Sequence, residues 1–449
     1  MVKIAFTGAG STIFVRNVIG DCMFMESLKD AELALYDIDA ERLKESAKIL
    51  SVLNDSINDG RMKIRTYCGP ANRKKALKNA DFVVNAIQVG GYKPSTVIDF
   101  EIPKKYGLRQ TIGDTLGIGG IFRALRTIPV LLDFARDMEE VCPNALFLNY
   151  SNPMAMLTGA VLQGSGIQTV GLCHSVQVCV ASLLWTVRGI TTAEVKKHTI
   201  TDKIAGINHM AWLLDFRYDG KDIYDEIRAE ARALIPKLCR ARKNKSGNIV
   251  RLEIMDKFGY YVTESSEHNA EYMPYWIKSR YPELIRKYNI PLDEYPRRCI
   301  NQIESWKKQY KEISSKPHLT HNLSREYGAR IMDAVITDVP YRINGNILNC
   351  GYIENLPADA VVEVPCMVDS RGVHGTVIGR LPTQCAALNM TNINPQLLAI
   401  EAALTRKKDT VYQAAMLDPH TSSELPIDKI IALCDDLFQA HGSMIPKYR

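Results

Sequence analysis

A cysteine and a histidine stand side by side in GLCHSVQ, residues 171–177, directly after an apolar run. Thiolate sulfur and imidazole nitrogen both bind metals, but no CxxC partner lies nearby in the sequence. The next candidate ligand is His209, in AGINHMAW at 205–212. Residue type and spacing therefore make Cys173 and His209 a candidate metal pair. The alternative is that both are structural, because a lone buried cysteine usually packs as a small apolar residue.

The stretch FTGAGSTIF, residues 6–14, has the pattern of a dinucleotide-binding turn, although the third glycine of the usual motif is absent. Gly8 would make the tight turn, and Gly10, followed by Ser11, would let the backbone approach a pyrophosphate at a helix N-terminus. Asp37 ends the second strand-like run, where its carboxylate would accept hydrogen bonds from ribose hydroxyls and repel a 2′-phosphate. The pattern predicts NAD rather than NADP. The alternative is a glycine turn in a sheet without a nucleotide.

Two further stretches place polar side chains at turns. Asn152 precedes a proline in NYSNPMAM, 149–156, so it cannot continue into a helix, and its amide would point into the crevice beyond a strand. Asp114 comes just before glycines that open a helix in GDTLGIGGIFRALRT, 113–127. Both side chains are candidates for substrate binding. The alternatives are a capped turn for Asn152 and an ordinary helix N-terminus for Asp114.

The elements that must position these residues are the strands and helices of a parallel sheet. Apolar runs typical of buried strands alternate with helical stretches such as 119–141, and the strand-like runs are 3–8, 32–37, 80–87, 145–150 and 168–173. This alternation predicts a doubly wound, Rossmann-like α/β domain. With its Asn-Pro turn, the N-terminal half also resembles the plan of the lactate and malate dehydrogenases. In such sheets ligands bind beyond the carboxyl ends of the strands, where Cys173 would lie.

A second domain is expected after the parallel sheet. The pattern changes near residue 195 to helices such as 324–336 with interspersed strands such as 360–368. We therefore expect an NAD-binding domain over 1–195 and a mixed α+β domain over 196–449 that contributes to substrate binding, metal binding and oligomer formation. A chain of 449 residues is long enough for two such cores.

Composition excludes several classes of protein. The net charge of +6, from 56 basic and 50 acidic residues, is too small and too dispersed to indicate nucleic-acid binding. The densest basic run, 239–248, is expected to be a solvated loop. No run reaches the roughly 20 apolar residues of a membrane span, and no secretory signal precedes the first strand. Eleven scattered cysteines indicate free thiols in a reducing cytoplasm.

The motifs taken together resemble the family 4 glycoside hydrolases, in particular their bacterial α-galactosidase branch. The similar stretches run in order over nearly the whole chain: FTGAGSTIF, DTLGIGGIFRALRT, NYSNPMAM, GLCHSVQ, GINHMAW, YYVTESSEHNAEY and AAMLDPHT. The resemblance implies an NAD- and metal-dependent glycosidase, with manganese as the usual metal. It implies that NAD⁺ takes a hydride from C3 of the sugar, that the C2 proton and the C1 substituent are then eliminated, and that water addition and re-reduction complete hydrolysis.

The resemblance also assigns roles to residues of this chain. Cys173 and His209 match the metal ligands, and Asn152 matches an asparagine that contacts the sugar near the metal. His174 stands where relatives have an acid that assists the leaving group, and histidine has a suitable pKa for that task. Without the family, His174 would be read as a histidine that only supports the site.

The base that removes the C2 proton is not fixed by the sequence. The corresponding stretch is 257–272, and the candidates within it are Tyr260, Tyr261, Glu267, His268 and Tyr272. We select His268 from this set. A homodimer or homotetramer is expected, acting on a small α-galactoside of the melibiose or raffinose type.

Three alternatives compete with this interpretation. A 2-hydroxy-acid dehydrogenase would share the N-terminal plan but would leave the Cys173–His209 pair unexplained. A family member acting on another α-glycoside would share every motif. A non-catalytic NAD sensor would not need polar residues at so many strand ends.

Overall fold

The computed structural model describes residues 1–241 and 246–449 of the chain. Its sheet begins with six parallel strands in the spatial order β3-β2-β1-β4-β5-β6, which is the order of the dinucleotide-binding fold. These strands are β1 Lys3–Thr7, β2 Glu32–Asp37, β3 Lys63–Cys68, β4 Phe82–Asn85, β5 Leu146–Asn149 and β6 Thr169–Gly171. The predicted Rossmann-like fold class is therefore confirmed. Only β3 was not anticipated, because it is an edge strand with polar, half-exposed side chains.

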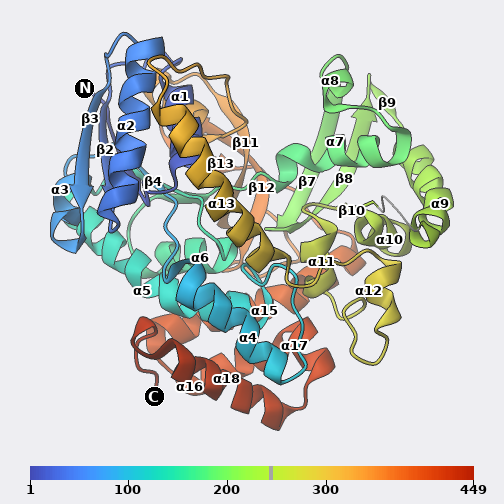
Figure 1. The fold of residues 1–449 in the computed structure, drawn as a ribbon. Helices are drawn as coiled ribbons and strands as arrows, with labels where there is room; N and C mark the ends of the chain where they lie inside the picture. Colours follow the sequence, from blue (N-terminus) through green and yellow to red (C-terminus); the bar gives the residue numbers. More distant parts are fainter. Residues whose placement is uncertain (242–245) are drawn as a thin grey trace.

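The sheet continues past β6 without a break. Five antiparallel strands extend it in the order β11-β12-β7-β8-β10, and β13 and β9 pair at its margins. Their bounds are β7 Ile200–Ile207, β8 Met210–Tyr218, β9 Lys221–Asp222, β10 Tyr261–Val262, β11 Tyr341–Leu348, β12 Val361–Asp369 and β13 Gly372–Gly375. Strands from both halves of the chain thus share one sheet, with the N-terminal strands on the left and the β7–β10 ribbon on the right (Figure 1).

Helices cover the sheet and form a separate group at the C-terminus (Figure 1). The helices are α1 Thr12–Cys22, α2 Ala40–Ile57, α3 Arg73–Leu77, α4 Val97–Lys105, α5 Gly117–Val141, α6 Met154–Gly164, α7 Ser175–Arg188, α8 Thr192–Val195, α9 Tyr224–Arg240, α10 Ile249–Phe258, α11 Ser266–Tyr272, α12 Glu283–Lys287, α13 Glu294–Ser314, α14 Gly328–Thr337, α15 Thr383–Thr405, α16 Lys408–Leu417, α17 Pro419–Glu424 and α18 Ile427–His441, with short helical turns η1 Pro70–Asn72, η2 Gly91–Thr96 and η3 Gly442–Met444.

The core is organised around α5, whose residues from Gly117 to Ile128 are all buried. This helix packs against α3, α4 and α6 and against α15, α16 and α17 of the C-terminal group, so neighbouring helices cover its buried residues. It also buries Arg126, which forms two hydrogen bonds of 3.0 and 2.6 Å to Asp99 of α4. Asp99 accepts a further bond from His441 of α18 at 2.9 Å, so this buried charge is paired and ties the C-terminus to the core.

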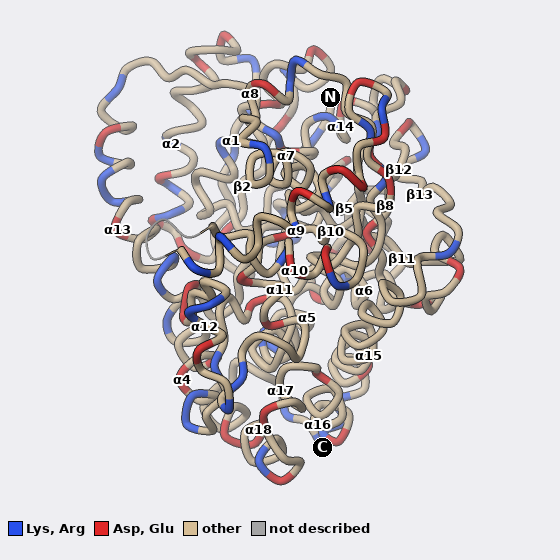
Figure 2. Tube along the Cα trace, turned by 90° about the vertical axis from the view of Figure 1, so that its right-hand side faces the viewer, with Lys and Arg blue, Asp and Glu red and all other residues tan. Residues whose placement is uncertain are grey.

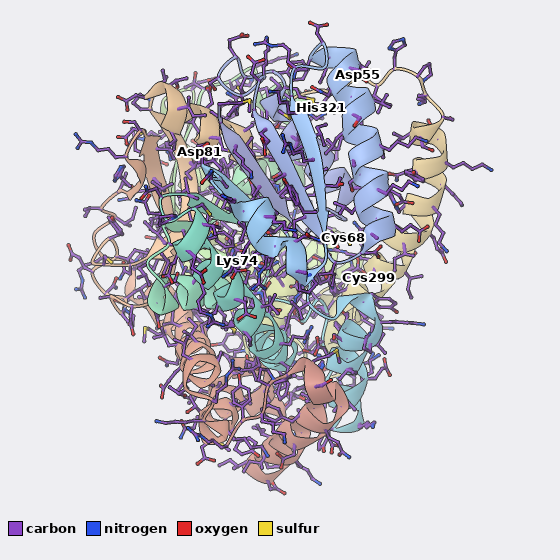
Figure 3. The ribbon with its side chains drawn as sticks, turned by 90° about the vertical axis from the view of Figure 1, so that its left-hand side faces the viewer. Asp55, Cys68, Lys74, Asp81, Cys299 and His321 are labelled. Carbon is purple, nitrogen blue, oxygen red and sulfur yellow. The ribbon has the colours of Figure 1, made fainter. Side chains whose placement is uncertain are left out.

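The segment after α12 returns to the N-terminal strands and helices. Helix α13 packs against α2, where the Trp306 indole donates to Glu45 at 3.0 Å. Beyond it, His321 bonds Asp21 of α1 at 2.7 Å, and Figure 3 shows His321 beside the N-terminal helices. Residues far past 195 therefore cover the first domain, and the division at residue 195 stays a prediction.

Charges of both signs alternate along the tube in Figure 2, without a stripe of one sign. The basic run 239–248 is not wholly a loop, because α9 continues through Arg240, and residues 242–245 lie outside the described residues. Across residues 1–241 and 246–449, none of the helices combines the length and the apolar character needed to cross a bilayer.

Candidate active site

The turn after β1 has the features of a dinucleotide site. Gly8 has φ +80°, and a Cβ there would lie 2.6 Å from the carbonyl of Ala86, so the turn requires glycine. The Gly10 amide donates to Asp37 Oδ2 at 2.6 Å, which fixes the carboxylate at the end of β2 beside the turn. Helix α1 begins directly afterwards, and the Ser11 side chain forms no capping bond within the described residues. The N–H groups in the first turn of α1 are therefore available to bind an anion.

Cys173 and His209 meet across the sheet although they are 36 residues apart. Cys173 follows the carboxyl end of β6, and His209 occupies the turn between β7 and β8 with φ +64°. Cys173 Sγ lies 3.3 Å from His209 Nε2. The structure thus brings together the two residues that the sequence placed at separate strand ends.

A row of paired residues across β6, β11, β12 and β7 connects the strand before Cys173 to the strand before His209. Gly171 of β6 pairs with Asn346, Asn346 pairs with Glu363, and Glu363 pairs with Gly206 of β7. Asn346 Nδ2 donates to the Gly171 carbonyl at 3.2 Å and to Glu363 Oε1 at 3.3 Å, and both polar side chains are fully buried. Burial, together with the nearby charge of Cys173, raises the pKa of Glu363 well above its ordinary value. Burial thus favours the protonated, uncharged form of Glu363 next to the Cys173–His209 pair.

The second nitrogen of His209 is also held. His209 Nδ1 lies 3.0 Å from the hydroxyl of Tyr272, which is fully buried on α11. A metal-binding histidine usually directs its other nitrogen to such a partner, which orients the ring. Nε2 therefore faces Cys173 as the available ligand atom.

Electrostatics favour the charged forms of both residues. Burial opposes ionisation of Cys173, but the His209 charge and hydrogen bond lower the pKa of its thiol below the ordinary value. Burial would lower the pKa of His209, yet the charges of Cys173 and Glu264 raise it to about 10. A pair of this kind exchanges its proton for a metal cation, since thiolate and neutral imidazole are the ligand forms.

Glu264 completes this cluster and was missed by the sequence analysis. Its Oε2 lies 3.5 Å from His209 Nε2, and the ligand atoms of Cys173, His209 and Glu264 all lie within 4.8 Å of one another. Burial would raise the pKa of Glu264, but the charges of His268 and His209 lower it to about 2. The available signal was only a polar residue following the strand-like run YYVT, which the sequence offers at many positions.

A polar wall lies beside the cluster. The His268 and His209 rings are 4.7 Å apart between centroids, and His268 Nε2 lies 3.9 Å from Asp114 Oδ1. Asn152 Nδ2 donates to Asp114 Oδ2 at 3.4 Å, while Asn152 Oδ1 is buried and has no hydrogen-bond partner among the described residues. A buried carbonyl of this kind indicates a position for a ligand donor such as a sugar hydroxyl.

Glu271 holds the loop that carries Asp114. Its carboxylate accepts bonds from the amides of Thr111 and Gly113, each at 2.8 Å. Burial raises the pKa of Glu271 to about 7, against the lowering effect of these amides. Sequence analysis missed this residue, because its function depends on a loop 158 residues away.

The remaining candidates lie in different surroundings. His174 Nε2 bonds Glu326 at 2.7 Å, and this hydrogen bond raises the pKa of His174. Tyr261 lies under the guanidinium of Arg251, with 4.2 Å from the guanidinium carbon to the ring centre. Tyr260 lies near another ring, with its centroid 6.3 Å from that of Tyr224.

Of the candidates for the base within 257–272, His268 and Tyr272 contact His209. Glu267 does not, and accepts a hydrogen bond from Arg298 at 3.2 Å. Burial lowers the pKa of His268 below its ordinary value, which favours the neutral imidazole, the form that can accept a proton.

The fold and the site define a Rossmann-like α/β protein with the glycine turn of a dinucleotide site and a cluster of metal-type donor atoms. A model of the family 4 glycosyl hydrolases matches residues 3–188, and the model of their C-terminal domain matches residues 204–421. The chain therefore belongs to the family 4 glycosyl hydrolases, and the resemblance noted in the sequence is confirmed.

One relative and two solved structures show how far the similarity extends. The chain is 58% identical to an α-galactosidase of Bacillus subtilis over the full length of both proteins. It superposes on the Bacillus subtilis protein lplD with a TM-score of 0.85 and 25% identity, covering 97% of this chain and 99% of that one. A 6-phospho-α-glucosidase from gut microorganisms, solved with NAD and Mn²⁺, superposes with a TM-score of 0.79 and 19% identity over the whole of both chains.

A more distant structure bears on the fold. Malate dehydrogenase from Plasmodium falciparum superposes with a TM-score of 0.51 and 13% identity, covering 92% of this chain and all of that one. The predicted similarity in plan to the malate dehydrogenases is thus confirmed at the level of fold.

Proposed function

We propose that this chain is an α-galactosidase that uses bound NAD and a divalent metal ion, manganese, to hydrolyse terminal α-galactosides of the melibiose or raffinose type. The observation that carries the proposal is the 58% identity to an α-galactosidase, which extends over all 449 residues. The dehydrogenase alternative is not favoured, because it leaves the Cys173–His209 contact without a function.

The residues present fit both groups. Gly8, Gly10 and the start of α1 would hold the pyrophosphate of NAD, and Asp37 would accept hydrogen bonds from the adenine ribose. Cys173 and His209 would hold the metal. When bound, NAD⁺ supplies a hydride acceptor and the metal supplies a Lewis acid for a carbonyl oxygen.

The substrate's course follows from that chemistry. With NAD bound as a reversible hydride acceptor for C3, removal of the C2 proton, departure of the C1 substituent and addition of water at C1 would give hydrolysis as the net result. This route avoids the pair of carboxylates on which ordinary glycosidases depend.

The chain's own residues bind the sugar and move the protons. The Asn152 carbonyl would accept a sugar hydroxyl, and Asp114 would hold the Asn152 amide in place. His268, neutral and buried, would remove the C2 proton. His174, kept protonated to higher pH by Glu326, would donate a proton to the leaving oxygen.

The direct test is hydrolysis of nitrophenyl α-galactoside by the purified protein, with NAD⁺ and Mn²⁺ supplied together and each omitted in turn. We expect release of nitrophenol only when both are present, and slower release from the matching β-galactoside, α-galacturonide and 6-phospho-α-glucoside. Faster reaction with one of those three, or full activity in the absence of both cofactors, would overturn the proposal. Oligomeric state and cellular location stay predictions.

A further inference from the structure

We propose that Glu264 is a third ligand of the metal held by Cys173 and His209, and that its carboxylate makes the site more favourable to manganese, relative to zinc, than Cys173 and His209 alone. The inference rests on the metal site of the proposed function and adds to it a residue that was not among the expected ligands.

The geometry places a carboxylate oxygen where a third ligand atom is needed. Glu264 Oε2 lies 3.5 Å from His209 Nε2, which itself lies 3.3 Å from Cys173 Sγ. All three atoms lie within 4.8 Å of one another, a spacing that one cation between them can satisfy. The ligands come from three separate strand ends, so a cation would join β6, β7 and β10 at one edge of the sheet.

The backbone fixes Glu264 against the His209 turn. Both residues have φ +64°, a left-handed conformation that is unfavourable for a non-glycine residue and persists only where the surroundings determine it. Thr263, just before Glu264, donates its amide to the Ala211 carbonyl at 2.8 Å and accepts the Ala211 amide at its hydroxyl at 3.1 Å. The two turns are therefore joined, and the Glu264 side chain is directed by a constrained backbone.

The two carboxylate oxygens of Glu264 differ in their surroundings. Oε1 accepts the Ser265 amide at 3.0 Å and lies 3.7 Å from His268 Nδ1, so neighbouring residues already hold it. Oε2 faces His209 Nε2. With Oε1 fixed from the protein side, Oε2 is the atom presented to a cation.

Donor chemistry explains why a third ligand matters. Thiolate and imidazole alone suit zinc or another soft ion, whereas a carboxylate oxygen suits manganese. Adding Glu264 gives one sulfur, one nitrogen and one oxygen donor. Three protein ligands still leave open positions for two sugar oxygens or water, as a catalytic metal requires.

The experiment measures metal binding by the NAD-loaded protein, independently of turnover. Free Mn²⁺ is followed by its electron paramagnetic resonance signal, and Zn²⁺ by competition, for the wild type, Glu264→Gln and Cys173→Ser. Glu304→Gln, an exposed carboxylate on α13, is the matched control. Unchanged NAD affinity in each variant verifies that the fold is intact.

We expect Glu264→Gln to weaken Mn²⁺ binding by more than about 10-fold and Zn²⁺ binding by less than about 3-fold, with Glu304→Gln like the wild type. Cys173→Ser should weaken Zn²⁺ at least as strongly as Mn²⁺. If Glu264→Gln binds Mn²⁺ like the wild type while Cys173→Ser does not, the ligand role of Glu264 is wrong and the metal site stands. Equal loss of both metals in Glu264→Gln overturns the selectivity. A wild type that binds neither metal overturns the site and its third ligand together.

Discussion

Replacing Asp37 by alanine tests the cofactor site, and the structure supplies its control two residues away. Asp37 Oδ2 accepts the Gly10 amide at 2.6 Å and Oδ1 accepts the Asp39 amide at 2.9 Å, which places the carboxylate at the end of β2 with lone pairs left for ribose hydroxyls. A hydrogen bond to a charged group contributes about 1.5–3 kcal/mol. Loss of the two hydrogen bonds from the ribose hydroxyls should reduce the binding free energy of NAD⁺ by about 3 kcal/mol, which weakens NAD⁺ binding by about 100-fold.

The Asp39→Ala variant removes a carboxylate of the same turn that has a different task. Asp39 Oδ1 accepts the amides of Glu41 and Arg42 at 3.0 and 3.1 Å and so caps α2. We expect this variant to lose about 1 kcal/mol of unfolding free energy and to keep its affinity for NAD⁺.

Calorimetric titration with NAD⁺ and NADP⁺ distinguishes ribose binding from a loosened turn. Asp37→Ala removes the charge that repels a 2′-phosphate, so NADP⁺ should lose less affinity than NAD⁺. A turn that is merely loosened would weaken both nucleotides equally. An unchanged dissociation constant for NAD⁺ in Asp37→Ala, or an equal loss in Asp39→Ala, would refute the reasoning.

Two further substitutions address the cluster. Cys173→Ser should lose the soft ligand and most activity while the fold survives. Wild-type activity should fall under oxidising conditions and return with a thiol reductant. Full activity with undiminished metal affinity in Cys173→Ser would exclude Cys173 as a metal ligand. Burial raises the pKa of Glu363, so the folded state retains a proton that the unfolded chain releases. The stability it contributes is complete below the unfolded pKa and falls by up to about 1.4 kcal/mol per pH unit as pH rises toward the folded pKa. We therefore compare the unfolding free energy of the metal-free wild type and Glu363→Gln by denaturant titration at several pH values. Taking their difference at neutral pH as the reference, the wild type should gain stability over the variant at pH 5 and lose stability relative to it at pH 8. Parallel pH profiles would contradict a protonated Glu363.

Local patterns predicted the N-terminal half well. The turn at Gly8 and the strand ending at Asp37 could be predicted from a few neighbouring residues, because a glycine turn and an apolar run do not depend on a distant partner. The edge strand β3 was not predicted, because its side chains are half-exposed and its sequence lacks an apolar run. The helix α9 extended into the basic run because a run of charges does not by itself end a helix.

The site was predictable only in part. Cys173 and His209 are 36 residues apart, and spacing alone left them an open alternative until the family motifs were considered. Glu264 and Glu271 lie within the quoted stretch YYVTESSEHNAEY, but residue type alone does not single them out, since their positions matter only where α11 and the turn before it meet loops from distant parts of the chain. Pairing between β8 and β10 brings Glu264 to His209, and a single sequence does not reveal that pairing.

The central claim is that the C2–H bond of the galactoside is broken and remade in each turnover. The measurement is hydrolysis in D₂O with NAD⁺ and Mn²⁺ present, followed by mass or NMR analysis of the released galactose. Oxidation and elimination predict deuterium at C2 of the product, because the proton removed by the base is replaced from solvent. A direct displacement at C1 leaves the C2–H bond intact. Galactose without deuterium at C2 would contradict the account, whatever the cofactor requirement of the reaction.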